Sequence, residues 1–459
     1  MARTVAELPS GPRITDHISL GVIARTFPLS KVRSALAATG KASVRQRDLP
    51  AQVVVYYVIA LALYMQSSYR EVLRCLLEGV QWLDRGSTIK VAGKSGISQA
   101  RTRLGWEAMR ALHDDVVKPI ALKTTRGAWY RAWRLVSLGG STFDVADETV
   151  NEAAFGRPGA SRGSSAFPQI RFVALVENGT HIVFASEMAD YATHEITLAK
   201  TVVAALDKDM LCLADRAFFG FALWTQAQEN GADLLWRIRK NLRLSPDKRL
   251  ADGSYLSRIY ASQWDFRHKT NGVVVRIIDY ALDGVADAEP VYRLATTILD
   301  PEQAPAQELA ALYHERWEIE TAFGELKTHL RGAQIVLRSK TPDLVRQEFY
   351  GLLMAHFAIR SLIHEAALKV NEDPDRLSFI HAVRVIRRKI QAPATFPPRR
   401  RQAAHDAMLA EILDERLPPR RGRRNQRGVK RKMSSFPLRR RGDPSPTAVD
   451  LAMAIRIIK

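Results

Sequence analysis

Four side chains that can act on phosphates follow one another at helical spacing in one short stretch. They are Tyr313, Arg316, Glu320 and Lys327. An α-helix turns about 100° per residue, so a helix here would place all four within roughly 60° of one another. Guanidinium and ammonium groups bind phosphate oxygens, and a carboxylate can hold a divalent cation. The spacing predicts a helix face suited to phosphate chemistry, although many charged helix faces are only solvated.

Apolar residues form a second stripe along the same stretch. They are Leu312, Ile319, Phe323, Leu326 and Leu330. Apolar residues at this spacing pack a helix against a core. We therefore expect the four polar side chains to lie along the edge of a buried face.

A further acid, Asp215, ends an apolar run that starts at Met210 and predicts a buried strand. An acid in this place can cap the helix that follows. It can also bind a metal, because α/β folds place their sites at strand ends. The run by itself leaves both roles open.

The chain changes from helical to strand-like patterns near residue 130. Residues 1–125 carry amphipathic helical patterns. Short apolar runs then predict three strands and a helix, over residues 134–139, 170–176, 181–186 and about 195–206. The strand ending in Asp215 comes next. This order predicts a multidomain α/β protein, and a ribonuclease-H-like core is one of several folds that fit it.

Residues 226–300 read as a β-rich region inside this core. Strand-like runs recur there, over residues 234–239, 273–278 and 291–296. Near the first run, Trp236 is followed by the basic residues Arg237 and Lys240. Basic residues beside an aromatic can follow a nucleic-acid backbone and stack a base. Packing is the alternative role for Trp236 and for Trp264, the second tryptophan of this region.

Composition points to a polyanionic partner. The formal net charge is +20 over 459 residues, and such basic proteins most often bind nucleic acid. The segment 396–459 contains an especially basic part, in which residues 416–441 hold twelve Lys or Arg and no acid. This tail is expected to contact DNA phosphates, with a solvated tail as the alternative.

Cysteine content and hydropathy predict a cytoplasmic protein without a membrane span. Cys75 and Cys212 are the two cysteines, too few for a disulfide framework or a zinc site. The longest apolar run, 53–65, is too short to cross a bilayer. The N-terminus also lacks the pattern of a signal peptide.

The pattern Y-x2-R-x3-E-x6-K at Tyr313–Lys327 resembles the signature of insertion-sequence transposases of the IS-four type, a branch of the DDE transposases. The stretch Leu213-Ala-Asp215-Arg216 resembles the second acidic motif of the same family. The resemblance implies a ribonuclease-H-like catalytic core over 126–395, with the β-rich insertion at about 226–300. A helical domain over 1–125 that binds transposon ends would precede it, and the basic segment 396–459 would follow it.

The resemblance also implies a reaction and its residues. Such enzymes cleave double-stranded DNA at transposon ends with Mg²⁺ or Mn²⁺ and join the freed ends to target DNA. Asp215 and Glu320 would bind the metal, and Tyr313, Arg316 and Lys327 would hold terminal phosphates. Pairing two ends implies at least a homodimer in the DNA complex.

One motif departs from the family pattern. The first catalytic acid is normally the Asp of an Asp-Gly-Thr/Ser motif, but here Gly139 precedes Gly140 and Ser141. Glycine offers no ligand to a metal that needs several carboxylates. Asp144 is a weak substitute. Two alternative functions therefore remain: a catalytically dead copy that only binds DNA, and a ribonuclease-H-like nuclease of another kind.

Overall fold

The chain forms a mixed α/β structure with many helices and a large mixed sheet. The computed structural model describes residues 22–43, 49–81, 92–160, 163–164, 167–239, 242, 244–285, 288–332, 336–389, 398–418 and 451–458. The chain divides into two compact units. Unit 1 consists of Met1–Trp129, Gly139–Val202 and Glu318–Leu417, and unit 2 of Tyr130–Leu138, Val203–Trp317 and Pro418–Lys459. Each unit gathers segments that are separate in the sequence.

Helices make up most of unit 1. They are α2 (Val22–Thr26), α3 (Leu29–Ala38), α4 (Ala51–Leu63), α5 (Tyr69–Gln81), α6 (Lys94–Leu104), α7 (Glu107–Val116), α8 (Thr149–Phe155), α9 (Glu195–Val202), α13 (Glu318–Gly324), α14 (Pro342–Lys369), α15 (Phe379–Lys389) and α16 (Pro398–Ile412). Every described element between residues 22 and 116 is a helix, as the sequence patterns of this region predict.

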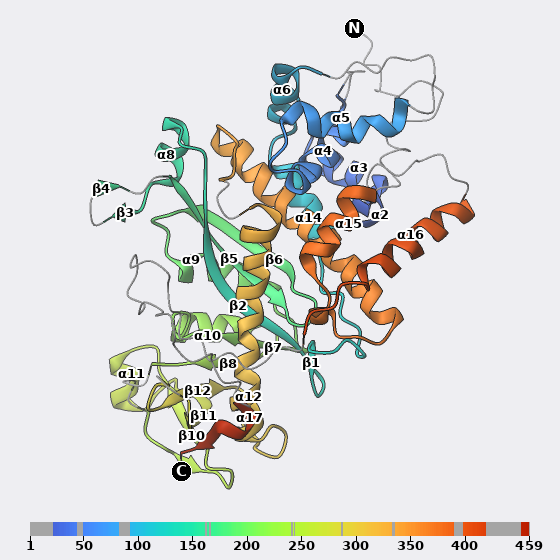
Figure 1. Cartoon of the computed structure of the whole chain (residues 1–459). Helices are drawn as coiled ribbons and strands as arrows, with labels where there is room; N and C mark the ends of the chain where they lie inside the picture. The colour runs from blue at the N-terminus through green and yellow to red at the C-terminus, as the bar shows by residue number, and fades with distance from the viewer. Residues whose placement is uncertain are drawn as a thin grey trace, which may run out of the picture. The chain divides into compact units, whose positions relative to one another are not determined.

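The long helix α14 is the centre of this helical packing. Thr341 occupies its N-cap position and Pro342 its first turn, where a proline is well tolerated. Its apolar residues lie on all sides, so it is buried, and it packs against α4 and α15 (Figure 1). At Gly351 the two helices α14 and α4 approach closely, since an added Cβ would lie 2.8 Å from Val58 Cγ1. A larger residue at position 351 would push α4 away.

Unit 1 also holds an antiparallel hairpin. Its strands are β5 (Gln169–Glu177) and β6 (Ile182–Asp190), and the order in the sheet continues from β5 to β2 (Trp133–Asp144). The turn contains Asn178 and Gly179, as the sequence predicts. Gly179 has a φ of +77°, and an added Cβ would lie 2.7 Å from the Arg126 carbonyl oxygen. Glycine is therefore required at this position. The short strands β3 (Gly159–Ala160) and β4 (Gly163–Ser164) form a separate pair.

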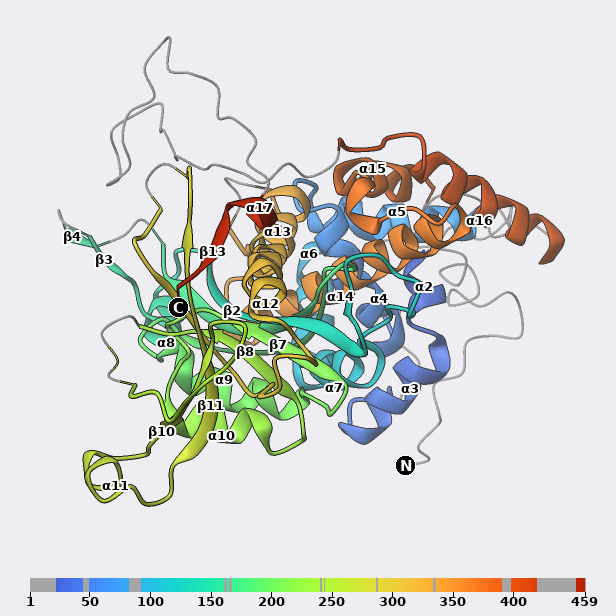
Figure 2. The ribbon, with the colours of Figure 1, turned by 90° about the horizontal axis from the view of Figure 1, so that it is seen from below.

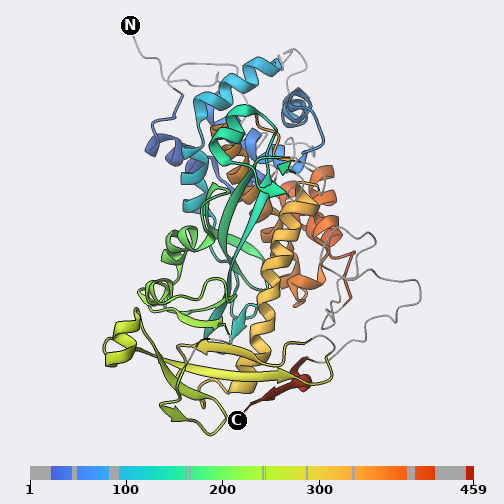
Figure 3. The same ribbon diagram turned by 90° about the vertical axis from the view of Figure 1, so that its left-hand side faces the viewer.

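Unit 2 contains parallel and antiparallel strands. The first half of β2 lies parallel to β7 (Met210–Ala214), which lies parallel to β8 (Asp233–Arg237). Antiparallel strands follow in the order β12 (Tyr292–Thr296), β11 (Val273–Leu282), β10 (Tyr255–Ile259) and β9 (Lys248–Arg249). These strands and the short helix α11 (Gln263–His268) can be followed in yellow-green in Figure 3. They lie within residues 226–300, the region in which the sequence predicts a β-rich insertion.

The C-terminal end of the chain joins this sheet. The sequence predicts a short apolar helix over residues 447–459. The structure instead has a one-turn helix, α17 (Leu451–Ala454), followed by a strand, β13 (Ile455–Ile457), which pairs with β11 (Figure 2). Ile455 lies in the core of unit 2 with Tyr280 and Leu309. The prediction was incomplete because the pairing edge belongs to β11, a strand far away in the sequence.

The stretch that carries the Y-x2-R-x3-E-x6-K pattern is helical but is not one regular α-helix. It consists of α12 (Ala306–Leu312), the 3₁₀ turn η2 (Tyr313–Trp317), α13, and the π-helix η3 (Glu325–Leu330). A 3₁₀ turn winds more tightly than an α-helix and a π-helix more loosely. The expected angle of roughly 60° assumed one regular α-helix over the whole stretch, and the structure has regular α-helix only in α12 and α13. The apolar stripe is confirmed from Ile319 to Leu330, while Leu312 is only partly buried.

None of the helices within the described residues combines the length and apolar character that a membrane crossing requires.

The buried Arg276 of β11 provides a test of this packing in unit 2. Its guanidinium is fully buried, pairs with Asp252, and donates hydrogen bonds to Ser254 Oγ at 2.8 Å and the Ala304 carbonyl at 2.7 Å. Arg276→Met leaves Asp252 without its cation, so we expect a loss of about 3–5 kcal/mol in the free energy of unfolding. Urea unfolding measures this loss.

The matched control is Arg258→Met on the neighbouring strand β10. Arg258 pairs with Asp247 at 3.3 Å, but both side chains are about half exposed. Such a surface pair contributes at most about 1 kcal/mol. Equal losses in the two variants would contradict the role given to Arg276.

Candidate functional site

Asp215 lies at the carboxyl end of the buried strand β7. All five residues of the strand are buried, and Leu138 of β2 is the register partner of Ala214. Asp215 directly follows Ala214 in the chain. The Asp215 carboxylate accepts a hydrogen bond from the Arg216 backbone N–H at 2.6 Å. The helix that follows, α10 (Phe221–Gln228), has Gly220 at its N-cap position and no side-chain cap. The structure thus excludes the alternative that Asp215 caps this helix.

In unit 2, Tyr313 lies close enough to Asp215 for the carboxylate charge to affect the pKa of the Tyr313 hydroxyl. Burial raises the pKa of the Tyr313 hydroxyl to about 12, with the Asp215 charge acting in the same direction. The guanidinium groups of Arg316 and Arg237 act on that pKa in the opposite direction. Unit 2 therefore gathers one acid, one phenol and two guanidinium groups, all four of which belong to residues predicted from the sequence.

Arg237 already has an anionic partner in this group. It forms an ion pair with Glu289 at 2.6 Å and lies over the Tyr292 ring at 4.9 Å. Arg216 reaches the same Glu289 carboxylate at 3.7 Å. A phosphate could replace Glu289 as the partner of these two guanidinium groups, since phosphate and carboxylate present the same kind of oxygen acceptor.

Unit 1 holds the predicted residues Glu320 and Lys327. Glu320 is exposed on α13, and the Lys327 ammonium donates a hydrogen bond to Ser141 Oγ at 3.0 Å. Burial lowers the pKa of Lys327, as does the neighbouring Arg331, whereas Asp144 and Glu320 raise it. Lys327 thus lies close enough to both Asp144 and Glu320 for their charges to affect its pKa.

Gly139 faces the residue that precedes Glu320. A Cβ added to Gly139 would lie 2.7 Å from Ile319 Cδ1, too close unless the isoleucine side chain moves. Asp144 lies further along β2, where Gln169 donates a hydrogen bond to it at 2.7 Å. The Asp144 carboxylate is therefore held by Gln169, whereas position 139 faces Ile319 of α13.

The two tryptophans of the β-rich insertion lie in contrasting surroundings. Trp236 is fully buried and packs edge-on against Trp224, so it cannot stack a base in this structure. Its burial favours the alternative role that the sequence left open, that of a packing residue. Trp264 is 61% exposed and stacks on His268. Lys240, the basic residue predicted beside Trp236, lies outside the described residues.

The sequence motifs did not indicate the acids on the inner side of the Glu320 helix. Glu318 and Glu325 are buried, as is His181 from the β5–β6 turn. The available signal was their seven-residue separation next to the apolar stripe, which places both acids toward the core. Charged residues there require buried partners.

Comparisons with known proteins identify the family. A family model described as the insertion element 4 transposase N-terminal region matches residues 17–114. A second, the transposase DDE domain, matches residues 135–358 and so spans Gly139, Asp215 and Glu320. The chain is 27% identical over 414 residues to the Escherichia coli K12 transposase InsG for insertion sequence element IS4, covering 88% of this chain and 90% of that protein.

The chain belongs to the IS4 family of DDE transposases. As a member of that family it is an insertion-sequence DNA transposase, an enzyme class that cleaves DNA and transfers strands. A solved piggyBac transposase synaptic complex with hairpin DNA covers 87% of this chain and 86% of its own, with a TM-score of 0.45 and 11% identity. That likeness is too distant to support an argument about residues.

His314, beside Tyr313 in this transposase, provides a pH test of the unit 2 group. Burial lowers the pKa of His314 to about 4, and the charges of Arg237 and Arg316 act in the same direction. The unfolded histidine titrates near 6.5. The stability that depends on the neutral ring is therefore complete above about pH 6.5 and is lost as the pH falls toward 4. Between pH 7 and pH 5, the free energy of unfolding should fall by about 2 kcal/mol less in His314→Gln than in the parent chain.

Urea unfolding at pH 7, 6 and 5 measures this effect, with His268→Gln as the control. The His268 side chain is exposed in the same unit. Its replacement is expected to leave the pH dependence of the parent chain in place. If both variants lose the same amount of stability as the parent between pH 7 and pH 5, His314 does not control this dependence.

Proposed function

We propose that this transposase binds the ends of its insertion sequence with the residues of its DDE domain, and that Gly139 leaves it without the first catalytic acid. The observation that carries the proposal is the position of Asp215, at the end of buried strand β7 and beside Tyr313, Arg237 and Arg316. A ribonuclease-H-like core is supported by the same strand. β7 lies parallel to β2 after the β5–β6 hairpin and helix α9, which is the expected order.

Asp215 and Glu320 suit a hard divalent cation because both offer carboxylate oxygens at partly or fully exposed positions. When bound, Mg²⁺ or Mn²⁺ would supply charge neutralisation and an activated water for phosphodiester cleavage. Arg316, Lys327 and the Tyr313 hydroxyl would hold the non-bridging phosphate oxygens and orient the strand. Since two transposon ends have to be paired, at least two copies of the chain would assemble on DNA.

Losing the first acid separates binding from cleavage. Cation contacts to phosphates do not depend on the missing carboxylate, so DNA-end binding remains. Replacing even an outer contact of a metal ligand typically costs about 10–100-fold in affinity or activity, and a direct ligand costs more. We therefore expect little or no cleavage by the chain as it stands. Asp144 is a poor replacement, because it is engaged by Gln169 and lies five positions further along β2.

Restoring the acid tests this assignment. Gly139→Asp introduces a Cβ that presses on Ile319 Cδ1, and Ile319→Val removes that methyl group. We expect Gly139→Asp, alone or with Ile319→Val, to raise Mg²⁺- or Mn²⁺-dependent cleavage of the element's own terminal DNA by at least about 100-fold. The assay is the appearance of cut strands on a denaturing gel.

Two further variants in the Gly139→Asp background serve as controls, Asp215→Asn and Glu320→Gln. Both are expected to return cleavage to the level of the parent chain. If the parent chain cuts as well as Gly139→Asp, the first acid is elsewhere and Asp144→Asn becomes the decisive variant. If cut ends are never joined to a second DNA molecule, a nuclease fits better than a transposase.

A second test concerns phosphate binding by Lys327. Its ammonium is half-buried beside Ser141 and within reach of the Glu320 charge. Lys327→Met removes one phosphate contact, so we expect about tenfold weaker binding of end DNA and a salt slope reduced by about one. Fluorescence anisotropy over a series of salt concentrations measures both quantities.

Lys369→Met is the matched control for Lys327→Met. Lys369 is an exposed lysine of the same unit that pairs with Asp406. It is expected to change neither the affinity nor the salt slope. An equal effect of the two substitutions would show that only the overall charge matters.

A further inference from the structure

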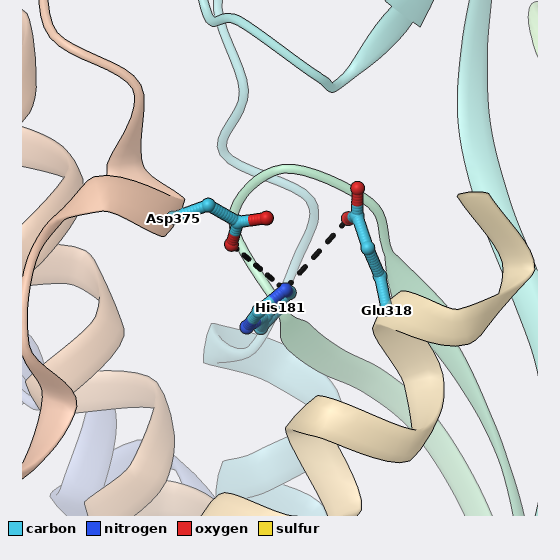
Figure 4. A group of neighbouring side chains, drawn as sticks. All are labelled: His181, Glu318 and Asp375. Carbon is cyan, nitrogen blue, oxygen red and sulfur yellow. Dashed lines mark ion pairs between the residues drawn. The ribbon is translucent and has the colours of Figure 1, made fainter. Parts of the chain in front are cut away.

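Three side chains that could bind a metal, two of them buried and one partly buried, meet inside unit 1, apart from Glu320 and Lys327. They are His181 of the β5–β6 turn, Glu318 at the start of α13, and Asp375 of the 3₁₀ turn η4 (Pro374–Arg376) (Figure 4). His181 Nε2 lies 2.9 Å from Asp375 Oδ1 and 3.8 Å from Glu318 Oε2. The side chains are 1%, 10% and 3% exposed, in the order His181, Asp375, Glu318. Each residue offers one ligand atom, and these three atoms lie within 4.8 Å of one another.

The second ring nitrogen of His181, Nδ1, has two neighbours. It lies 3.2 Å from Glu325 Oε1, and Arg360 Nη2 also contacts it. Histidines that bind metals usually donate that second N–H to a carboxylate, which fixes the ring and leaves Nε2 for the ion. Glu325 is itself held by His356 Nε2 at 2.9 Å and Arg360 Nε at 2.8 Å. The Glu318 carboxylate accepts a hydrogen bond from the Gly179 backbone N–H.

The cluster is rich in carboxylates with little access to water. Glu318 and Glu325 are buried, and the Asp375 side chain is 10% exposed. Arg360 forms an ion pair with Glu325. Buried carboxylates are costly unless cations offset their charge, and a divalent ion offers two positive charges.

We propose that His181, Glu318 and Asp375 bind one divalent transition-metal ion of the zinc class at a structural site distinct from Asp215 and Glu320. One imidazole and two carboxylates are a ligand set that Zn²⁺ accepts. Ligands about 2.1 Å from a tetrahedral ion lie about 3.4 Å apart, so the present spacing requires only small side-chain adjustments. The ion would fasten the β5–β6 turn, the start of α13 and η4 to one another, next to the turn of helix that carries Glu320.

Metal analysis of the full-length chain tests this proposal. The protein is made without a histidine tag, incubated with Zn²⁺, and separated from free metal before elemental analysis. We expect about one Zn²⁺ per chain at about pH 7.5 and a Tm that rises with added Zn²⁺, because binding to the folded state stabilises it. His181→Gln and Asp375→Asn should each lose the ion and the Tm response. Cobalt substitution provides a second readout, because a tetrahedral site gives intense visible absorption.

Matched variants separate this site from the catalytic one. Glu320→Gln removes a carboxylate two positions from Glu318, and Glu372→Gln removes one three positions from Asp375. Both should keep the Zn²⁺ and the Tm response. Loss of the ion in Glu320→Gln but not in His181→Gln would assign it to the DDE residues and overturn the proposal. A parent chain that binds no Zn²⁺ and shows no Tm response would overturn it as well.

Discussion

Charge buried inside unit 1 has to be compensated, and this constraint fixes the segment that carries Glu320. Burial alone would raise the pKa of Glu325, but Arg360, His181 and His356 hold it well below the usual value, so the carboxylate is charged. Leaving such a charge without a partner costs about 3–5 kcal/mol. Residues 318–325 therefore cannot slide or rotate without losing contacts that the fold requires. Glu320 lies on the exposed side of the same segment. The contacts of the buried acids Glu318 and Glu325 therefore determine the direction in which the Glu320 side chain points.

Unit 2 positions its acid by a different principle. β7 is buried along its whole length and is held on both sides by parallel pairing with β2 and β8. Its last residue, Ala214, fixes where Asp215 emerges. A strand end in a packed sheet offers little freedom, so the backbone beside Asp215 is as rigid as the sheet. Hydrogen bonds and ion pairs then orient the side chains around it, with Glu289 keeping Arg216 and Arg237 in place.

Local sequence patterns predicted the features that depend on local physics. The apolar run 210–214, the turn at Asn178-Gly179 and the stripe from Ile319 to Leu330 are all found in the structure. The departures arise from contacts between distant segments. The change from α-helix to 3₁₀ and π-helix over 313–330 and the pairing of β13 with β11 have no signal in neighbouring residues. Trp236 belongs to the same class, because its burial depends on Trp224 rather than on the basic residues beside it.

Gly139 is packed against apolar atoms, although the proposed assignment expects the first catalytic acid at this position. Catalytic carboxylates face water or a metal and contribute little to packing, so losing one leaves the core unchanged. Here the space next to position 139 is taken by the Ile319 methyl group, which lies where a Cβ would meet it. Ile319 is fully buried by this packing, and the contact joins β2 to α13 through apolar atoms alone. Under the proposed assignment, a polar position has thus become part of the core. Such a chain would keep its stability and its basic residues while lacking one metal ligand, which is the combination expected of a binding-competent but cleavage-deficient transposase.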